Sequence, residues 1–216
     1  MNETLVKDID GNSYKTVKIG EQIWMAENLK VTQYRNGDPI PNLTDENDWQ
    51  NTEQGAYCNC KYDNRGDDVE TYGRLYNWYA VDDKRGLAPR GWHIPTDDEI
   101  KELEMHLGMS QEEADGRTRR GTNEGSKLAG MADLWSDGNL ENNPEFGTSG
   151  FDFLPGGYRG VSSGQYVSMG NSGYFWSSTE QHHNTAWHRS LGYAYSVINR
   201  VGNSRRHGFS VRCIKD

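Results

Sequence analysis

The sequence is poor in cysteine, in proline and in long apolar runs. It contains three cysteines and six prolines in 216 residues, and 33% of its residues are hydrophobic. No apolar run approaches the roughly 20 residues that span a bilayer, so we expect no membrane insertion. The segment Met1-Asn2-Glu3-Thr4 has neither the basic nor the apolar part of a secretory signal peptide, so no signal peptide is visible in this chain.

The three cysteines offer little covalent chemistry. Cys58 and Cys60 are separated by one residue, which is too close for an easy mutual bridge, so a disulfide would join one of them to Cys213. Such a bridge would leave an odd thiol, and a zinc site would need a fourth ligand that the spacing does not supply. We expect buried thiols, with the long-range bridge as the alternative.

Positive charge is scarce and is concentrated at the C-terminal end. The chain holds 23 basic and 32 acidic residues, a net charge of −9. Residues 181–216 hold six basic residues and one acid, a net charge of +5, so the preceding part is strongly acidic. Phosphate binding requires a positive face, so we expect no nucleic-acid partner. The basic end either favours an anionic ligand or pairs with the acidic body.

Aromatic residues and glycine, in contrast, are abundant. The 7 Trp, 12 Tyr and 5 Phe can each bury a large area, and 25 glycines are more than a helical bundle tolerates. This composition predicts short strands with long, well-packed loops. No linker-like segment divides the chain, so we expect a single domain of residues 1–216.

Local patterns predict several elements. Alternating polarity in 14–19, then a turn and the apolar segment 22–25, predicts a hairpin. Thr96 and Glu99 form a capping box that starts a helix, and Gly108 ends it. We further expect short helices in 72–81 and 126–134, strands in 174–179, 186–191 and 208–214, and loops in 35–72 and 110–124.

Short motifs in order along nearly the whole chain resemble one family. They are Asp8-Ile9-Asp10-Gly11-Asn12 with residues 14–20, Trp24-Met25-Ala26-Glu27-Asn28-Leu29, Gly73-Arg74-Leu75-Tyr76-Asn77-Trp78, Gly91-Trp92-His93-Ile94-Pro95-Thr96, Leu154-Pro155-Gly156-Gly157, Phe175-Trp176-Ser177-Ser178-Thr179-Glu180 and Gly208-Phe209-Ser210-Val211-Arg212-Cys213. Together they resemble the Fibrobacter succinogenes major paralogous domain family, among the C-type-lectin-like folds. The resemblance implies an α+β fold with short antiparallel strands, about two helices and long loops, in which the first and last strands pair.

Domains of this kind also serve as variable proteins of diversity-generating retroelements in phages and bacteria. There a reverse transcriptase randomises adenines in the C-terminal part of the gene, and AAC or AAT codons never become Lys, Glu, Gln, Met or Trp codons. Residues 188–211 contain none of these five types, whereas Gln181 does not fit such an origin. The resemblance thus implies a non-enzymatic binding protein whose variable, ligand-binding region is 182–206.

The residue types of this region suit a ligand-binding surface. Tyr supplies rigid amphipathic area, and Ser, Gly and Asn supply adaptable hydrogen bonds. On the strand 186–191, Trp187, Arg189 and Leu191 share the scaffold face, which leaves His188 and Ser190 outward. The candidate ligand-binding residues are His182, His183, Asn184, His188, Ser190, Tyr193, Tyr195, Ser196, Asn199, Val201 and Asn203. The alternative interpretation is an ordinary solvated loop region.

Other site chemistry has weaker support. His182-His183 with His188 would make a poor metal site, because neighbours on a strand point to opposite faces. No motif supports a catalytic pair of His93 with Cys58 or Cys213, and we expect no catalytic residue and no metal ligand. The oxygen-rich residues Asp133, Asp137, Asn139, Glu141 and Asn143 leave calcium open as a cofactor.

The resemblance implies a surface-exposed protein on a phage virion or a bacterial cell. Its partner would be a protein or glycan receptor on a target cell. Two alternatives remain at this point. The first is an enzyme like the formylglycine-generating enzymes, which share the broad fold and use a cysteine pair, although Cys58-Asn59-Cys60 lies in the wrong kind of segment. The second is a fixed structural cell-surface domain.

Overall fold

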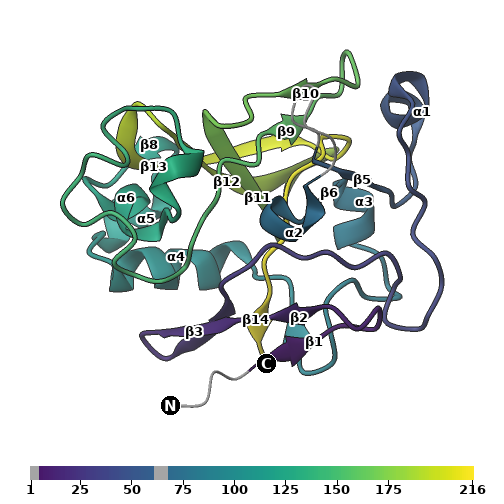
Figure 1. Cartoon of the computed structure of the whole chain (residues 1–216), viewed down its shortest axis with the longest axis horizontal. Helices are drawn as coiled ribbons and strands as arrows, with labels where there is room; N and C mark the ends of the chain where they lie inside the picture. Colours follow the sequence, from purple (N-terminus) through teal and green to yellow (C-terminus); the bar gives the residue numbers. More distant parts are fainter. Residues whose placement is uncertain (1–4, 61–67) are drawn as a thin grey trace.

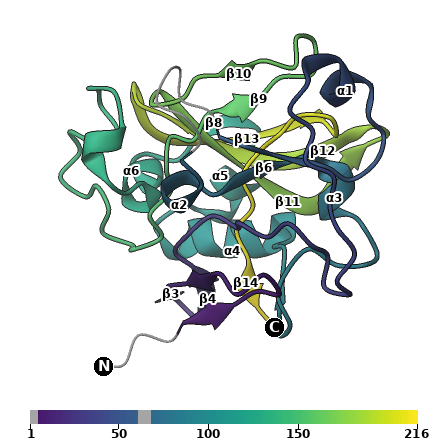
Figure 2. The same cartoon turned by 45° about the vertical axis from the view of Figure 1, so that its right-hand side comes forward.

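The computed structural model describes residues 5–60 and 68–216. It is a mixed α+β structure in which mostly antiparallel sheets surround short helices (Figure 1). One four-stranded sheet has the strand order β11-β12-β13-β8, and the other has the order β3-β4-β14-β7. Helix α4 (Asp97–His106) lies between these two sheets in both views (Figure 1, Figure 2). None of the helices in the described ranges is both long and apolar enough to cross a bilayer.

The smaller of the two main sheets joins the N-terminal hairpin to the C-terminal strand. The predicted hairpin is confirmed as β3 (Thr16–Ile19) paired with β4 (Gln22–Met25). Strand β14 (Ile214–Lys215) lies between β4 and β7 (Trp92–His93), with Ile214 opposite both Trp24 and His93. The expected pairing of the first strand with the last is wrong in detail, because β1 (Val6–Lys7) pairs with β2 (Ser13–Tyr14).

The larger sheet is a meander of three long strands with a short edge strand. Its strands are β11 (Ser172–His182), β12 (Thr185–Gly192), β13 (Tyr195–Ser204) and β8 (Thr118–Arg120). The strands expected in 174–179 and 186–191 are confirmed and extend further. The loop expected in 110–124 is wrong: α5 (Gln111–Asp115) begins with a Ser110–Glu113 capping box, and β8 pairs with β13.

Short helices are more numerous than the sequence indicates. The capping box of Thr96 and Glu99 is confirmed at the start of α4. The expectation of about two helices is wrong, because the described residues contain six, of which five have only four to six residues, too few for a clear apolar periodicity. The other helices are α1 (Glu46–Asn51), α2 (Val69–Tyr72), α3 (Trp78–Val81) and α6 (Glu124–Leu128), with a 3-10 turn at Ala132–Leu134.

The expected loop 35–72 and helix 72–81 also contain strands. Strand β5 (Tyr57–Asn59) pairs with β6 (Arg74–Tyr76), and β6 leads directly into α3. The Asn77 side chain accepts a hydrogen bond from the amide of Ala80 and so starts α3. Residues 61–67 of the expected loop lie outside the described residues. The remaining short pair is β9 (Tyr158–Arg159) with β10 (Tyr166–Val167).

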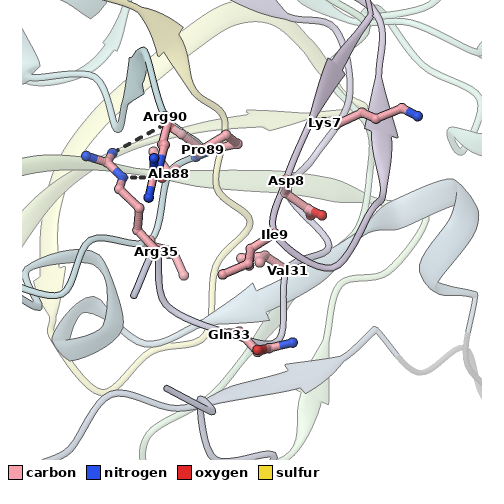
Figure 3. A pocket seen from close by; sticks show the side chains of 10 residues that line it. Lys7, Asp8, Ile9, Val31, Gln33, Arg35, Ala88, Pro89 and Arg90 are labelled. Atoms are coloured by element: carbon pink, nitrogen blue, oxygen red, sulfur yellow. Dashed lines mark hydrogen bonds between the residues drawn. The ribbon is translucent and has the colours of Figure 1, made fainter. Parts of the chain in front are cut away.

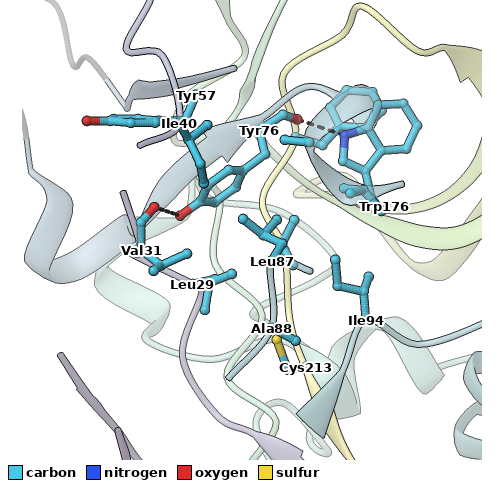
Figure 4. Packing of buried hydrophobic residues seen from close by; sticks show 14 of the residues in the cluster. Leu29, Val31, Ile40, Tyr57, Tyr76, Leu87, Ala88, Ile94, Trp176 and Cys213 are labelled. Atoms are coloured by element: carbon cyan, nitrogen blue, oxygen red, sulfur yellow. Dashed lines mark hydrogen bonds between the residues drawn. The ribbon is translucent and has the colours of Figure 1, made fainter. Parts of the chain in front are cut away.

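Aromatic side chains dominate the core. In one cluster the Tyr76 hydroxyl donates to the carbonyl of Val31 and the Trp176 indole donates to the carbonyl of Tyr76, at 2.7 and 2.9 Å (Figure 4). The buried thiol of Cys213 belongs to this cluster. Cys58 and Cys60 are buried in another cluster, around Trp49 and Leu75. The alternative of a long-range disulfide is therefore wrong.

Candidate functional site

The pairing of β11, β12 and β13 assigns their side chains to two faces. Phe175, Arg189 and Arg200 form one row across the three strands, and Trp176, His188 and Val201 form the next. Side chains alternate between the faces of a sheet, so neighbouring rows point in opposite directions. We call the face that contacts α4 the inner face, and the opposite one the outer face.

The inner face is fastened to α4 by a buried network of ion pairs. Arg189 donates to Asp97 and Glu104 at 2.8 and 2.6 Å, and Arg200 donates to Asp97 at 2.6 Å. Arg120 of β8 donates to Glu104 at 2.8 Å, and Glu104 is 0% exposed. Burial raises the pKa of Asp97, but hydrogen bonds and charge from Arg200 and Arg189 outweigh it and hold the pKa at about 2. The network therefore stays charged and joins three strands to one helix.

Most of the basic C-terminal end is paired with the acidic body. Besides Arg189 and Arg200 in the inner network, Arg205 pairs with Glu180. Arg206 pairs with Glu53 at 2.6 Å. Of the two interpretations of this basic segment, pairing within the chain is the one that the contacts support.

The outer face carries an aromatic cluster centred on Phe209. The ring of Phe209 lies 4.3 Å from Trp176, 4.7 Å from His188 and 5.1 Å from Tyr174, between ring centroids. His188 and Ser190 do point to the outer face, but their expected exposure is wrong: they are 2% and 7% exposed. His188 is buried because the ring of Phe209 packs against it on the outer face.

His188 is a neutral core residue. Burial, with the nearby Arg189 and His207, lowers the pKa of His188 to about 3. His182 and His183 lie instead in or beside the exposed turn between β11 and β12. Within the described residues no three His, Cys, Asp or Glu side chains come together as a metal site.

The other candidate residues do not form one patch. His182, His183 and Asn184 lie at one end of the meander, with Asn203 nearby opposite Ala186. Tyr193, Tyr195 and Ser196 lie at the other end, and the eight residues of β12 place these ends about 25 Å apart. Asn199 and Val201 lie between the ends, half-buried on the outer face. The structure thus divides the candidate set into two ends and a middle.

The end with the tyrosines contains a hollow of about 400 Å³, which we call the asparagine hollow. Tyr193 and Tyr195 are 38% and 44% exposed, among the few large apolar side chains that face solvent. The hollow is lined by Tyr195, Ser196, Val197, Thr122, Asn139, Asn142, Asn143 and Pro144. Its neutral amides and hydroxyls provide both hydrogen-bond donors and acceptors.

The wall of this hollow is held by hydrogen bonds to backbone carbonyls. The amide of Leu140 donates to the carbonyl of Tyr193 at 2.9 Å, and the Ser196 hydroxyl donates to the carbonyl of Asn139 at 2.9 Å. A Cβ on Gly138 would lie 2.4 Å from the Tyr193 carbonyl oxygen, so the two segments are in close contact. The hollow is therefore a preformed feature.

Sequence reasoning missed Asn142 as a site residue and considered Asn139 and Asn143 for calcium only. In the structure, the carboxylate of Asp137 accepts from the Asn142 side chain at 2.8 Å, and that of Glu141 accepts from the amide of Gly138. These acids are engaged within their own loop. The richness of 139–143 in asparagine, a residue type common in binding surfaces, is the signal in the sequence that could have pointed to the hollow.

Arg119 was also missed. It is exposed on β8, lies opposite Asn199, and its guanidinium carbon lies 3.6 Å from the ring centroid of Tyr195. Together with Asn199, Ser190 and Tyr174 it forms a polar row across all four strands. Only the pairing of β8 with β13 reveals this position, because β8 is separated from β13 in the sequence.

The geometry does not provide the cysteine–histidine pair that the sequence left open. The two ring nitrogens of His93 lie 2.8 Å from Asp216 and 2.7 Å from Glu99. Burial raises the pKa of the Cys213 thiol, which disfavours the thiolate that a nucleophile requires. Cys58 is buried in the cluster around Trp49.

The comparisons with known proteins give one match. A family model described as the Fibrobacter succinogenes major domain matches residues 17–215. No curated protein matches the chain, and no solved structure matches it. The matched span contains α4, the whole β11–β13 meander and the asparagine hollow. The chain therefore belongs to the Fibrobacter succinogenes major domain family.

Proposed function

We propose that this chain is a non-enzymatic binding module with a C-type-lectin-like scaffold. Its ligand surface is the tyrosine end of the outer face, made of Tyr193, Tyr195, Asn199 and Arg119 with the asparagine hollow beside them. Its partner is a protein or glycan receptor on a target cell, and the module acts at the surface of a phage virion or a bacterial cell.

The observation that carries this proposal is the difference between the two faces of the meander. The inner face is fastened by Arg189 and Arg200 to buried carboxylates of α4. The outer face ends in exposed tyrosines beside a polar hollow. A scaffold that draws its stability from one face tolerates changes on the other. The arrangement therefore suits a surface that varies without unfolding the protein.

The burial of residues on the two faces also narrows the variable region 182–206 that we propose for a diversity-generating retroelement protein. Within 182–206, Arg189, Leu191, Ile198 and Arg200 are buried and must stay constant. Exposed and half-buried residues of the turns and of the outer face are free to vary, whereas Ser196 holds the wall of the hollow through its bond to Asn139. The candidate set here reduces to His182, His183, Asn184, Tyr193, Tyr195, Asn199, Val201 and Asn203. The lack of Lys, Glu, Gln, Met and Trp in 188–211 agrees with diversification through AAC or AAT codons.

Two libraries displayed on yeast test this proposal without knowledge of the natural receptor. The outer library randomises Tyr193, Tyr195, Asn199 and Val201. The matched inner library randomises Arg189, Leu191, Ile198 and Arg200. Both are sorted for folded display, and then for binding to immobilised hen lysozyme and to a glycan array.

We expect most members of the outer library to be displayed, and binders to be enriched from it over successive rounds. We expect most members of the inner library to fail at display, because they leave buried carboxylates unpaired or cavities unfilled. Equal loss of display in the two libraries, or an outer library that yields no binder to any target, would contradict the proposal.

A further inference from the structure

A second pocket lies beside the N-terminal strands and shares no lining residue with the asparagine hollow. It has a volume of about 340 Å³, at the low end of the roughly 300–1,000 Å³ typical of small-molecule sites. The turn after β1 forms one side, and the segments 31–35 and 87–90 form the other. In Figure 3, Lys7 lies on one side, Arg35 and Arg90 lie on the other, and Ile9 and Val31 lie between them.

The floor of this pocket is apolar and rigid. Val31, Leu87 and Ala88 are buried members of the main core cluster. Ile9 forms a wall and is 47% exposed, one of the few large apolar side chains that face solvent. A ligand with an apolar body would cover Ile9 and rest on a surface that does not need to rearrange.

The rim of the pocket is basic although the protein is acidic. Lys7, Arg35 and Arg90 are exposed, and within the described residues none of them forms an ion pair. The one acid at the pocket is Asp8, whose carboxylate already accepts hydrogen bonds from Asn12 and from the Tyr14 hydroxyl. Three cations against one engaged carboxylate give a local positive potential on a chain of net charge −9.

Backbone carbonyls hold the side chain of Arg35 at the rim of this pocket. Its Nε donates to the carbonyl of Ala88 at 3.0 Å, and its Nη2 donates to the carbonyl of Pro89 at 3.3 Å (Figure 3). The Nη2 also donates to the carbonyl of Trp92 at 2.9 Å. These bonds fix the guanidinium group without neutralising its charge. A guanidinium that is preorganised in this way loses little entropy when it binds an anion.

We propose that this pocket binds a small organic anion that has an apolar body, such as an aryl- or alkyl-carboxylate. The apolar part lies on Val31, Leu87 and Ile9, and the carboxylate lies against Arg90 and the fixed Arg35, while Lys7 on the opposite side adds to the positive potential of the site. This site shares no residue with the asparagine hollow, so the test of this proposal does not depend on the proposed receptor surface.

The test uses 4-phenylbutyrate as the probe and its uncharged amide as the matched comparison. Binding to the full chain is measured by isothermal titration calorimetry at low salt, and backbone amide NMR shifts locate the probe. The double variant Lys7→Gln/Arg90→Gln removes two charges from the rim. The control Lys15→Gln/Lys84→Gln removes two exposed charges outside the pocket. Arg35 is left intact because it also fastens the backbone.

We expect 4-phenylbutyrate to shift amides in 7–9, 31–35 and 87–90, and to bind more tightly than the amide. The rim variant should weaken binding about tenfold, because it removes one partly exposed charge contact and lowers the positive potential of the pocket, whereas the control variant should bind as the parent does. Ile9→Asp, a substitution at an exposed position that should not impair folding, should abolish binding. The proposal is overturned if acid and amide bind equally, if the control weakens binding as much as the rim variant, or if the shifts map elsewhere.

Discussion

Replacing Asp97 by Asn tests the role of the inner ion network. The carboxylate of Asp97 accepts hydrogen bonds from Arg189 at 2.8 Å and from Arg200 at 2.6 Å, and the change leaves both guanidinium groups buried beside a neutral amide. Removing one partner of a buried ion pair costs about 3–5 kcal/mol. Glu104 still contacts Arg189, so we expect the lower end, about 3 kcal/mol. In a chain of this length that loss lowers the melting temperature by roughly 10 °C.

Urea unfolding followed by tryptophan fluorescence measures this loss. The control is Asp98→Asn, which changes a neighbouring exposed carboxylate and should cost less than about 0.5 kcal/mol. Because the pKa of Asp97 lies below its unfolded value, its contribution is fully present above about pH 4 and is lost as the pH falls towards 2. The difference in stability between parent and Asp97→Asn should therefore shrink over that range. An equal loss in the two variants, or a difference that stays constant down to pH 2, would refute the role of the network.

Three further predictions concern other parts of the fold. Phe209→Ala removes the central ring of the outer aromatic cluster and should cost about 3–5 kcal/mol in urea unfolding, whereas Tyr193→Ala should change stability by less than about 0.5 kcal/mol. Burial lowers the pKa of His93, but its bonds to Asp216 and Glu99 outweigh burial and raise it. The stabilisation that His93 contributes to the fold is therefore present below about pH 6.5 and is lost as the pH rises through the raised pKa. The free energy of unfolding of His93→Gln, measured between pH 5 and 9, should not show this loss. Gly125→Ala should destabilise the protein by more than about 1 kcal/mol, because the added Cβ would lie 2.6 Å from the carbonyl oxygens of Ser196 and Val197. The control Gly160→Ala should be tolerated, because the atom nearest to its Cβ lies at 3.6 Å. Equal shifts of the melting temperature in the two variants would contradict this packing.

The elements with local signals were predictable from the sequence. The hairpin of β3 and β4 follows from alternation around a turn, and α4 follows from the capping box of Thr96 and Glu99. Short helices were expected in 72–81 and 126–134, where α3 and part of α6 lie. Strand β13 and the helices α1, α2 and α5 were not predicted, because a polar strand and a helix of four to six residues give no clear periodicity. The number of helices and the role of 110–124 were therefore wrong.

The candidate site was predictable only in part, because burial depends on distant contacts. Alternation along β12 correctly separated Arg189 from His188, but it could not show that Phe209 covers His188. The partners of Arg189 and Arg200 on α4 are 92 and 103 residues away, and no local pattern signals them. The separation of Tyr193 from His183 likewise follows from the length of β12, which places two turns at opposite ends.

The 3′ end of the gene and its flanking DNA give the most direct test of the central claim, which is that a variable ligand surface lies on a constant scaffold. We predict a nearby near-copy of the codons for 176–213 that differs almost only at adenines, together with a reverse transcriptase gene. The differing codons should fall on the refined candidate residues, such as Tyr193, Tyr195 and Asn199, and should spare Arg189 and Arg200. The absence of such a copy would contradict diversification, and a copy that differs mainly at the buried inner positions would contradict the division of the meander into two faces.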